Sequence, residues 1–232
     1  MFKLFSRKRS EESKDLIYVS LVQAIQRGGC PICRLVSEAE EQSIRSLLYE
    51  HVNDPHMRKK IVESMGFCPY HFWMLVDLAL EDPSLGGGLG PAIILEDLIT
   101  RYLEVSTSPS AECFLCKQRR EFEEIYIKSF AEKLGCTDIL QRYRSAKNSI
   151  LCRKHFNAIA NLVPSDEVRR EFIEIQRSKL IDLRDLIRRY IDKHDYRCRE
   201  HITREEGEAW IRAVEFFAGY RYLLVPKRIR GF

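Results

Sequence analysis

The stretch that decides the fold reads GGCPICRLVSEAEE and runs from Gly28 to Glu41. It opens with a Cys-x2-Cys pair, Cys30 and Cys33, and a Cys-x2-His pair follows at Cys68 and His71. Paired half-sites of these two kinds are a common way to give zinc its four tetrahedral ligands. The sequence therefore predicts a Cys3His metal centre in this part of the chain.

The same pattern occurs a second time. The second Cys-x2-Cys pair follows the first at an offset of 83 residues, and the second Cys-x2-His pair at an offset of 84. Between the half-sites, five further residues match at the offset of 83, which indicates an internal duplication. Each copy is expected to form its own centre, from Cys30, Cys33, Cys68 and His71 in the first and from Cys113, Cys116, Cys152 and His155 in the second.

The eight cysteines are better explained as metal ligands than as disulfides. The N-terminus has no long apolar stretch of the kind a secretory signal needs, so we expect a cytoplasmic protein, in a reducing compartment. Zinc is the expected metal, with two ions per chain and a structural role, because four protein ligands leave no open position for a water. An iron–sulfur centre is the alternative, since such clusters also accept mixed Cys/His ligation. A redox dithiol would require a βαβ context that this chain lacks.

Helical periodicity dominates the segments between the half-sites. Apolar residues from Leu35 to Val52 follow one helical stripe, and Asp54 and Pro55 are suited to cap and open the next helix. Each interval between half-sites is thus predicted to be a helical hairpin that returns the chain to its metal. A long charged helix from about Glu167 to His194 and a last helix around Trp210 complete an all-α fold.

The predicted organisation follows the two repeats. A basic tail occupies residues 1–14, the first Cys3His repeat residues 15–107, the second repeat with its C-terminal helices residues 108–226, and a second basic tail residues 227–232. The boundary lies at the linker-like stretch STSPSA, residues 106–111.

Charge and hydropathy bear on the partners. No apolar run approaches the length of a transmembrane helix. The net charge of +4 is unevenly distributed, with 7 basic and 13 acidic residues from Asp15 to Thr107, and 10 basic and 6 acidic from Ser108 to Pro164. This asymmetry favours self-association or a protein partner, and only weak binding of nucleic acid to the basic second repeat.

We identify no complete catalytic constellation. The favoured function is a protein-binding or scaffold module, with a nucleic-acid-associated protein as the alternative and a redox protein third.

Two further sets of residues are candidates for roles around the metal. His194, Cys198 and His201 resemble a third half-site without a Cys-x2-Cys partner. Glu38 and Glu41, with their counterparts Glu121 and Glu124, are candidate acceptors for the second N–H of the ligand histidines, although a solvated helix face is the favoured interpretation.

The motifs resemble those of a prokaryotic family catalogued as a domain of unknown function. The similar stretches are Gly28–Glu41, LLYEHVNDP at Leu47–Pro55, GFCPYHF at Gly66–Phe72, KHDYR at Lys193–Arg197 and the segment Glu208–Gly219. The resemblance covers most of the chain. It supports the architecture and implies no activity, substrate or partner.

Overall fold

The structure is a computed structural model, and it describes residues 16–105 and 112–220. Within these ranges the chain is helical, with one isolated β-bridge between Gly29 and Ser149 and no β-strand, so the predicted all-α class is confirmed. In the same ranges, every helix is too short or too polar to cross a bilayer. The predicted tails and the linker at residues 106–111 lie outside the described residues.

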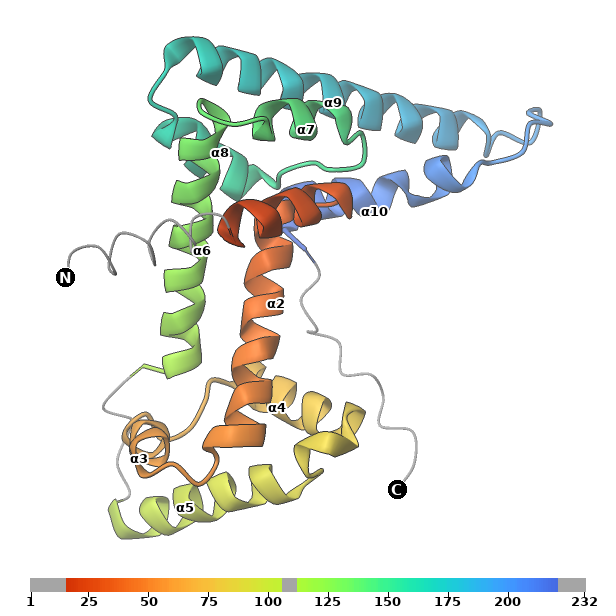
Figure 1. The fold of residues 1–232 in the computed structure, drawn as a ribbon. Coiled ribbons are helices and arrows are strands. Elements are labelled where there is room, and N and C mark those ends of the chain that lie inside the picture. Colours follow the sequence, from red (N-terminus) through yellow and green to blue (C-terminus); the bar gives the residue numbers. More distant parts are fainter. Residues whose placement is uncertain (1–15, 106–111, 221–232) are drawn as a thin grey trace. The chain divides into compact units, whose positions relative to one another are not determined.

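The described chain begins with a helix over residues 16–26. The further helical elements, most of them labelled in Figure 1, are α2 (Pro31–Ser46), the π-helix η1 (Leu47–His51), α3 (Pro55–Glu63), α4 (Pro69–Glu81), the 3-10 helix η2 (Pro83–Leu85), α5 (Leu89–Val105), α6 (Phe114–Leu134), α7 (Ile139–Ser145), α8 (Arg153–Leu162), α9 (Asp166–Asp192) and α10 (Arg204–Ala218).

Two compact units divide the chain. One unit, called the split unit here, joins the segment that ends at Leu35 to the segment that begins at Glu123. The other, called the inserted unit, begins at Val36 and runs to Phe122. Helices α2 and α6 each begin in one unit and end in the other, because both unit boundaries fall inside these helices. The compact units therefore do not follow the two sequence repeats.

The inserted unit has a core in which α3 and α4 pack against α5. Ile44 from α2 and Met74, Leu75 and Leu78 from α4 are almost fully buried in it. The start of α3 follows the sequence prediction, because the Asp54 carboxylate accepts the N–H of His56 at 2.9 Å and Pro55 occupies the first helical position.

The split unit is built around α9, which packs against α10 and α8. The predicted long charged helix is α9, and the Ser165 side chain caps it by accepting the N–H of Val168. Phe172 of α9 packs in an aromatic cluster with Phe130 and Tyr143, with ring centroids 5.9–6.3 Å apart. This cluster forms a rigid base beside the first of the two sites described below.

Candidate metal centres

All eight predicted ligands gather in two groups of four. Centre 1 consists of Cys30, Cys33, Cys152 and His155, and centre 2 of Cys68, His71, Cys113 and Cys116. Within each group, one ligand atom per residue lies within 4.8 Å of the others. Centre 1 lies wholly in the split unit and centre 2 wholly in the inserted unit. Each group could hold one metal ion.

The predicted pairing within each repeat is wrong, because each centre takes its Cys-x2-Cys pair from one copy and its Cys-x2-His pair from the other. The reason lies in helix length. In the first copy, α2 and η1 have 16 and 5 residues and carry the chain roughly 30 Å along their axis, whereas the 9 residues of α3 could bring it back by at most about 14 Å. In the second copy, α6 has 21 residues and α7 has 7. Because the outgoing and returning helices of each copy differ so much in length, the Cys-x2-His pair of a copy does not return to the Cys-x2-Cys pair of that copy and joins the other one instead.

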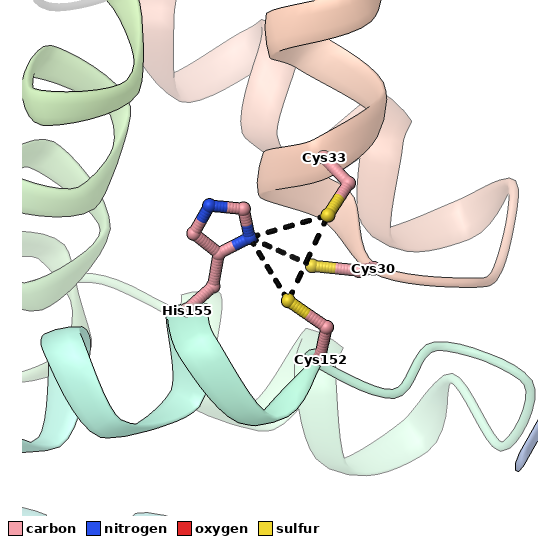
Figure 2. Close-up of side chains that lie close together, drawn as sticks. All are labelled: Cys30, Cys33, Cys152 and His155. Atoms are coloured by element: carbon pink, nitrogen blue, oxygen red, sulfur yellow. Dashed lines mark hydrogen bonds between the residues drawn. The ribbon is translucent and has the colours of Figure 1, made fainter. Parts of the chain in front are cut away.

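The distances in both centres fit a tetrahedron around an ion. Metal–sulfur bonds of about 2.3 Å and metal–nitrogen bonds of about 2.0 Å imply edges of about 3.8 Å between sulfurs and about 3.6 Å between sulfur and nitrogen. In centre 1, Nδ1 of His155 lies 3.2–3.4 Å from the three sulfurs, and the sulfurs of Cys33 and Cys152 are 3.7 Å apart. Figure 2 shows the three sulfurs converging on this ring nitrogen.

Centre 2 repeats this geometry. The nitrogen Nδ1 of His71 lies 3.1 Å from the sulfur of Cys68, 3.6 Å from that of Cys113 and 3.5 Å from that of Cys116. The sulfurs of Cys68 and Cys116 are 3.5 Å apart. In both centres, therefore, three sulfurs and one imidazole nitrogen occupy the corners of one small tetrahedron.

Every half-site opens a helix. Cys30, Cys68, Cys113 and Cys152 each directly precede a helix, and their carbonyls accept the N–H four residues later at 2.9–3.2 Å. The second ligand of each half-site is then the third residue of that helix. Backbone N–H groups and the positive end of the helix dipole surround the sulfurs, which favours the thiolate form that binds metal.

A backbone bridge joins the two half-sites of centre 1. Gly29 donates its N–H to the carbonyl of Asn148 at 2.9 Å, and its own carbonyl accepts the N–H of Ile150 at 3.1 Å. The preceding Gly28 has φ of +79°, and a Cβ there would lie 3.2 Å from the Asn148 oxygen. A side chain at position 28 would therefore be strained and would crowd the bridge.

Two side chains of α9 hold the backbone of the segment that leads to Cys152. Lys179, almost fully buried, donates hydrogen bonds to the carbonyls of Ala146 at 2.6 Å and Ser149 at 2.9 Å. Gln176 donates to the carbonyl of Leu151 at 2.8 Å. Buried side chains of one helix thus fix the backbone that positions a ligand, a contribution that the sequence pattern did not reveal.

Each ligand histidine uses its second ring nitrogen on a carboxylate, which is buried at Glu40 and half-buried at Glu123. His71 donates its Nε2 hydrogen to Glu40 at 3.1 Å, and His155 donates its own to Glu123 at 2.7 Å. The two acceptors occupy equivalent positions of the duplication, since their numbers differ by 83. Carboxylates in this position orient a ligand imidazole and raise its basicity. The residues proposed for this role from the sequence, Glu38 and Glu41 with Glu121 and Glu124, are not the ones found here.

The electrostatics of centre 1 favour a cation. Burial raises the pKa of the Cys30 thiol well above its ordinary value, whereas hydrogen bonds from Cys30 and Cys33 lower the pKa of Cys152. Burial opposes a charged imidazole, but hydrogen bonds with Cys152, Cys33 and Glu123 outweigh it and raise the pKa of His155 to about 11. The donors alone thus hold one thiolate beside one imidazolium. An ion bound by three thiolates would displace the remaining protons.

In centre 2, too, burial raises the pKa of one thiol while hydrogen bonds lower that of another. This centre is less buried, since Cys68 and Cys116 are partly exposed. Burial raises the pKa of Cys116 to about 12. Burial also acts to raise the pKa of Cys113, but its hydrogen bond with His71 and the backbone hydrogen bonds from Cys68 and Cys116 together outweigh burial and lower that pKa to about 6. Arg119 lies 3.5 Å from the Glu40 carboxylate, so the acid behind this centre has a second cationic neighbour.

The proposed third half-site does not come together in the part of the chain that the structure describes. His194, Cys198 and His201 belong to neither group of potential ligands. The ring of His194 instead donates its Nδ1 hydrogen to the carbonyl of Tyr190 at 2.8 Å and packs edge-on against the Tyr190 ring. The remaining cysteine, Cys136, is exposed and lies near the carbonyl of Glu132.

Comparison with known proteins confirms the resemblance to an uncharacterised family. Residues 13–104 match the model described as "Family of unknown function (DUF6062)". The chain is also similar to the "Uncharacterized 23.9 kDa protein in xynA 3'region" of Caldicellulosiruptor sp. (strain Rt8B.4), with 29% identity over 210 residues, 86% of this chain and 99% of that protein. No solved structure matches the chain. The role of the two centres must therefore be argued from their geometry.

Proposed function

We propose that this chain is a zinc protein whose two ions are structural, and that the scaffold they stabilise binds another protein. The observation that carries the metal assignment is the closed donor set of three sulfurs and one nitrogen in each centre. Four protein ligands leave no position for a water or a substrate, which is the signature of a structural site. The carboxylate behind each histidine is a further feature of such sites.

Metal analysis of natively purified protein tests this assignment. We expect about two zinc ions per chain and no absorption band in the visible range, because zinc has a filled d shell. Iron with a visible band would establish the iron–sulfur alternative in place of zinc. A fully folded preparation that holds no metal would refute the structural role.

Exposed apolar side chains support the protein-binding part of the proposal. On α5, Leu95, Ile99, Tyr102 and Leu103 are between 40% and 77% exposed and follow one stripe at spacings of four, three and one residues. Contiguous apolar surface of this kind marks protein contacts more often than ordinary solvated surface. A protein partner is therefore a better fit than a charged polymer.

The basic residues of the second repeat, which suggested nucleic acid, have acidic neighbours. Arg142 pairs with Asp138 at 2.7 Å, Arg144 pairs with Glu171, and Lys154 pairs with the Glu123 carboxylate at 2.6 Å. Phosphates would have to compete with these carboxylates. We expect at most weak binding to duplex DNA, without the steep salt dependence of about −0.9 per phosphate contact. A tight complex that depends on salt in that way would replace the protein-binding proposal by the nucleic-acid one.

A further inference from the structure

An apolar groove runs along one face of α9 in the split unit. It has a volume of about 440 Å³ and is open to solvent along its length. Helix α9 supplies most of its lining, and α8, which packs against α9, contributes Phe156. Figure 1 shows the two helices. The lining residues are Phe156, Ile173, Gln176, Arg177, Leu180, Ile181 and Arg184. None of them is a metal ligand, although Gln176 also holds the segment that leads to Cys152.

The floor of the groove offers apolar contacts and no spare hydrogen-bonding groups. Ile173 and Ile181 are 38% and 40% exposed, so both present apolar surface to the groove. The one uncharged polar lining residue, Gln176, uses its oxygen to accept from Tyr143 and its nitrogen to donate to Leu151. An occupant must therefore present apolar side chains to this floor.

The charged groups that line the groove are both arginines. The side chains of Arg177 and Arg184 are 71% and 53% exposed, and they lie seven residues apart on the same side of α9. Glu174 and Asp185 lie beside them at 3.8 and 2.9 Å but do not line the groove. Exposed pairs of this kind contribute little to stability. The rim thus favours an occupant with acidic residues.

The shape of the groove favours a helix. From Ile173 to Arg184 the lining extends about 17 Å along α9, or three helical turns. The residues recur at i, i+4, i+7, i+8 and i+11, which is the spacing of the ridges and grooves by which helices pack on each other. Building on the proposed protein-binding function, we propose that this groove binds an amphipathic α-helix of a partner protein whose apolar stripe is flanked by acidic residues.

Two synthetic helical peptides test the proposal with the full-length, zinc-loaded chain. Both carry leucines at helical spacing, and they differ only in having glutamates or lysines beside the stripe. Fluorescence anisotropy is expected to show saturable binding of the glutamate peptide and much weaker binding of the lysine peptide. The double substitution Arg177→Glu and Arg184→Glu reverses the charge of the groove rim. It should lower the affinity for the glutamate peptide by roughly 5- to 30-fold and raise the affinity for the lysine peptide.

A matched pair of isoleucine variants tests the apolar floor. Ile173→Ser should lower the affinity for the glutamate peptide about 10-fold, since it removes an apolar contact that the bound peptide would bury. Ile191→Ser changes an isoleucine of the same helix that is 61% exposed and lies outside the groove, and it should leave the affinity within about twofold. Equal effects of the two variants, or equal binding of the two peptides, would refute the proposal.

Zinc content measured on each preparation separates this inference from the proposed function. Protein that holds about two zinc ions and binds neither peptide overturns the groove proposal while leaving the structural role of zinc intact. Protein that binds the glutamate peptide with the expected preferences but is folded without zinc supports the groove and refutes the structural role of the metal.

Discussion

Replacement of both Cys33 and Cys152 by serine removes two ligands that the structure assigns to centre 1. Each single replacement should lower the zinc content from about two to about one ion per chain. The double replacement should also leave about one, because both ligands belong to the same ion. Replacement of Cys33 together with Cys68 should remove nearly all zinc, because these residues belong to different centres.

The effect on stability can be worked out from the chain lengths that the ions close. Cys33 and Cys152 are 119 residues apart, and Cys68 and Cys116 are 48 residues apart. If a bound ion restricts the unfolded chain as a covalent cross-link does, loss of centre 1 costs about 5 kcal/mol and loss of centre 2 about 4 kcal/mol. Since domains of this size are stable by about 5–15 kcal/mol, the loss of both centres should unfold the protein.

Metal analysis and urea unfolding of the single variants at Cys33, Cys68 and Cys152 and of the two double variants together decide the pairing. The Cys33/Cys152 double variant should be no less stable than its less stable parent, which is the non-additivity expected of two groups that act as one. The Cys33/Cys68 double variant, which loses both centres, should show no cooperative unfolding transition because it is already unfolded without urea. The opposite pattern, with zinc absent from the first double variant and one ion retained in the second, would refute the crossed pairing and restore the pairing within each repeat.

Three further variants test the surroundings of the centres. Glu123→Gln should weaken zinc binding at centre 1 by roughly 10- to 100-fold in a chelator competition while centre 2 serves as the internal control, and an unchanged affinity would contradict the role of the carboxylate. Burial lowers the pKa of Lys179 from 10.5 to about 8, so the unfolded chain binds this proton more tightly and the protein gains stability as the pH rises through that interval. Relative to Lys179→Met, the wild type should gain about 2 kcal/mol between pH 7 and pH 9.5 in urea unfolding, and a constant difference would show that the lysine is not buried as described. Asp54→Ala should cost about 1 kcal/mol of unfolding free energy with the zinc content unchanged, whereas a loss of zinc would link the α3 cap to centre 2.

The position of each half-site at a helix start could be predicted from local sequence, but the pairing of the half-sites could not. Spacing and residue type identify a Cys-x2-Cys or Cys-x2-His pair, and Pro31 and Pro69 mark helix starts. The two copies are chemically equivalent, however, so the choice of partner depends on how far each helix carries the chain. The apolar stripe predicted a helical path as far as Val52, which α2 and η1 form, but it did not show that the following helix α3 has only 9 residues.

Local sequence also could not predict which glutamate accepts the hydrogen bond of His71. Glu38, Glu40 and Glu41 lie within one turn of α2, and all three have counterparts in the second copy. They point in directions that differ by about 100° per residue. Which of them reaches His71 depends on the rotation of α2 relative to α4, and this is set by packing of the core. The duplication could therefore narrow the set of candidates but could not select Glu40.

The order of the ligands along the chain has a consequence for synthesis on the ribosome. At 5–20 residues per second, about 6–24 s separate the emergence of Cys33 from that of Cys152. During this interval the nearest complete donor set for the first cysteine pair is the one that ends at His71, which is the non-native combination. If an ion binds the chain before Cys152 emerges, we expect this non-native set to hold it and to exchange it before centre 1 closes.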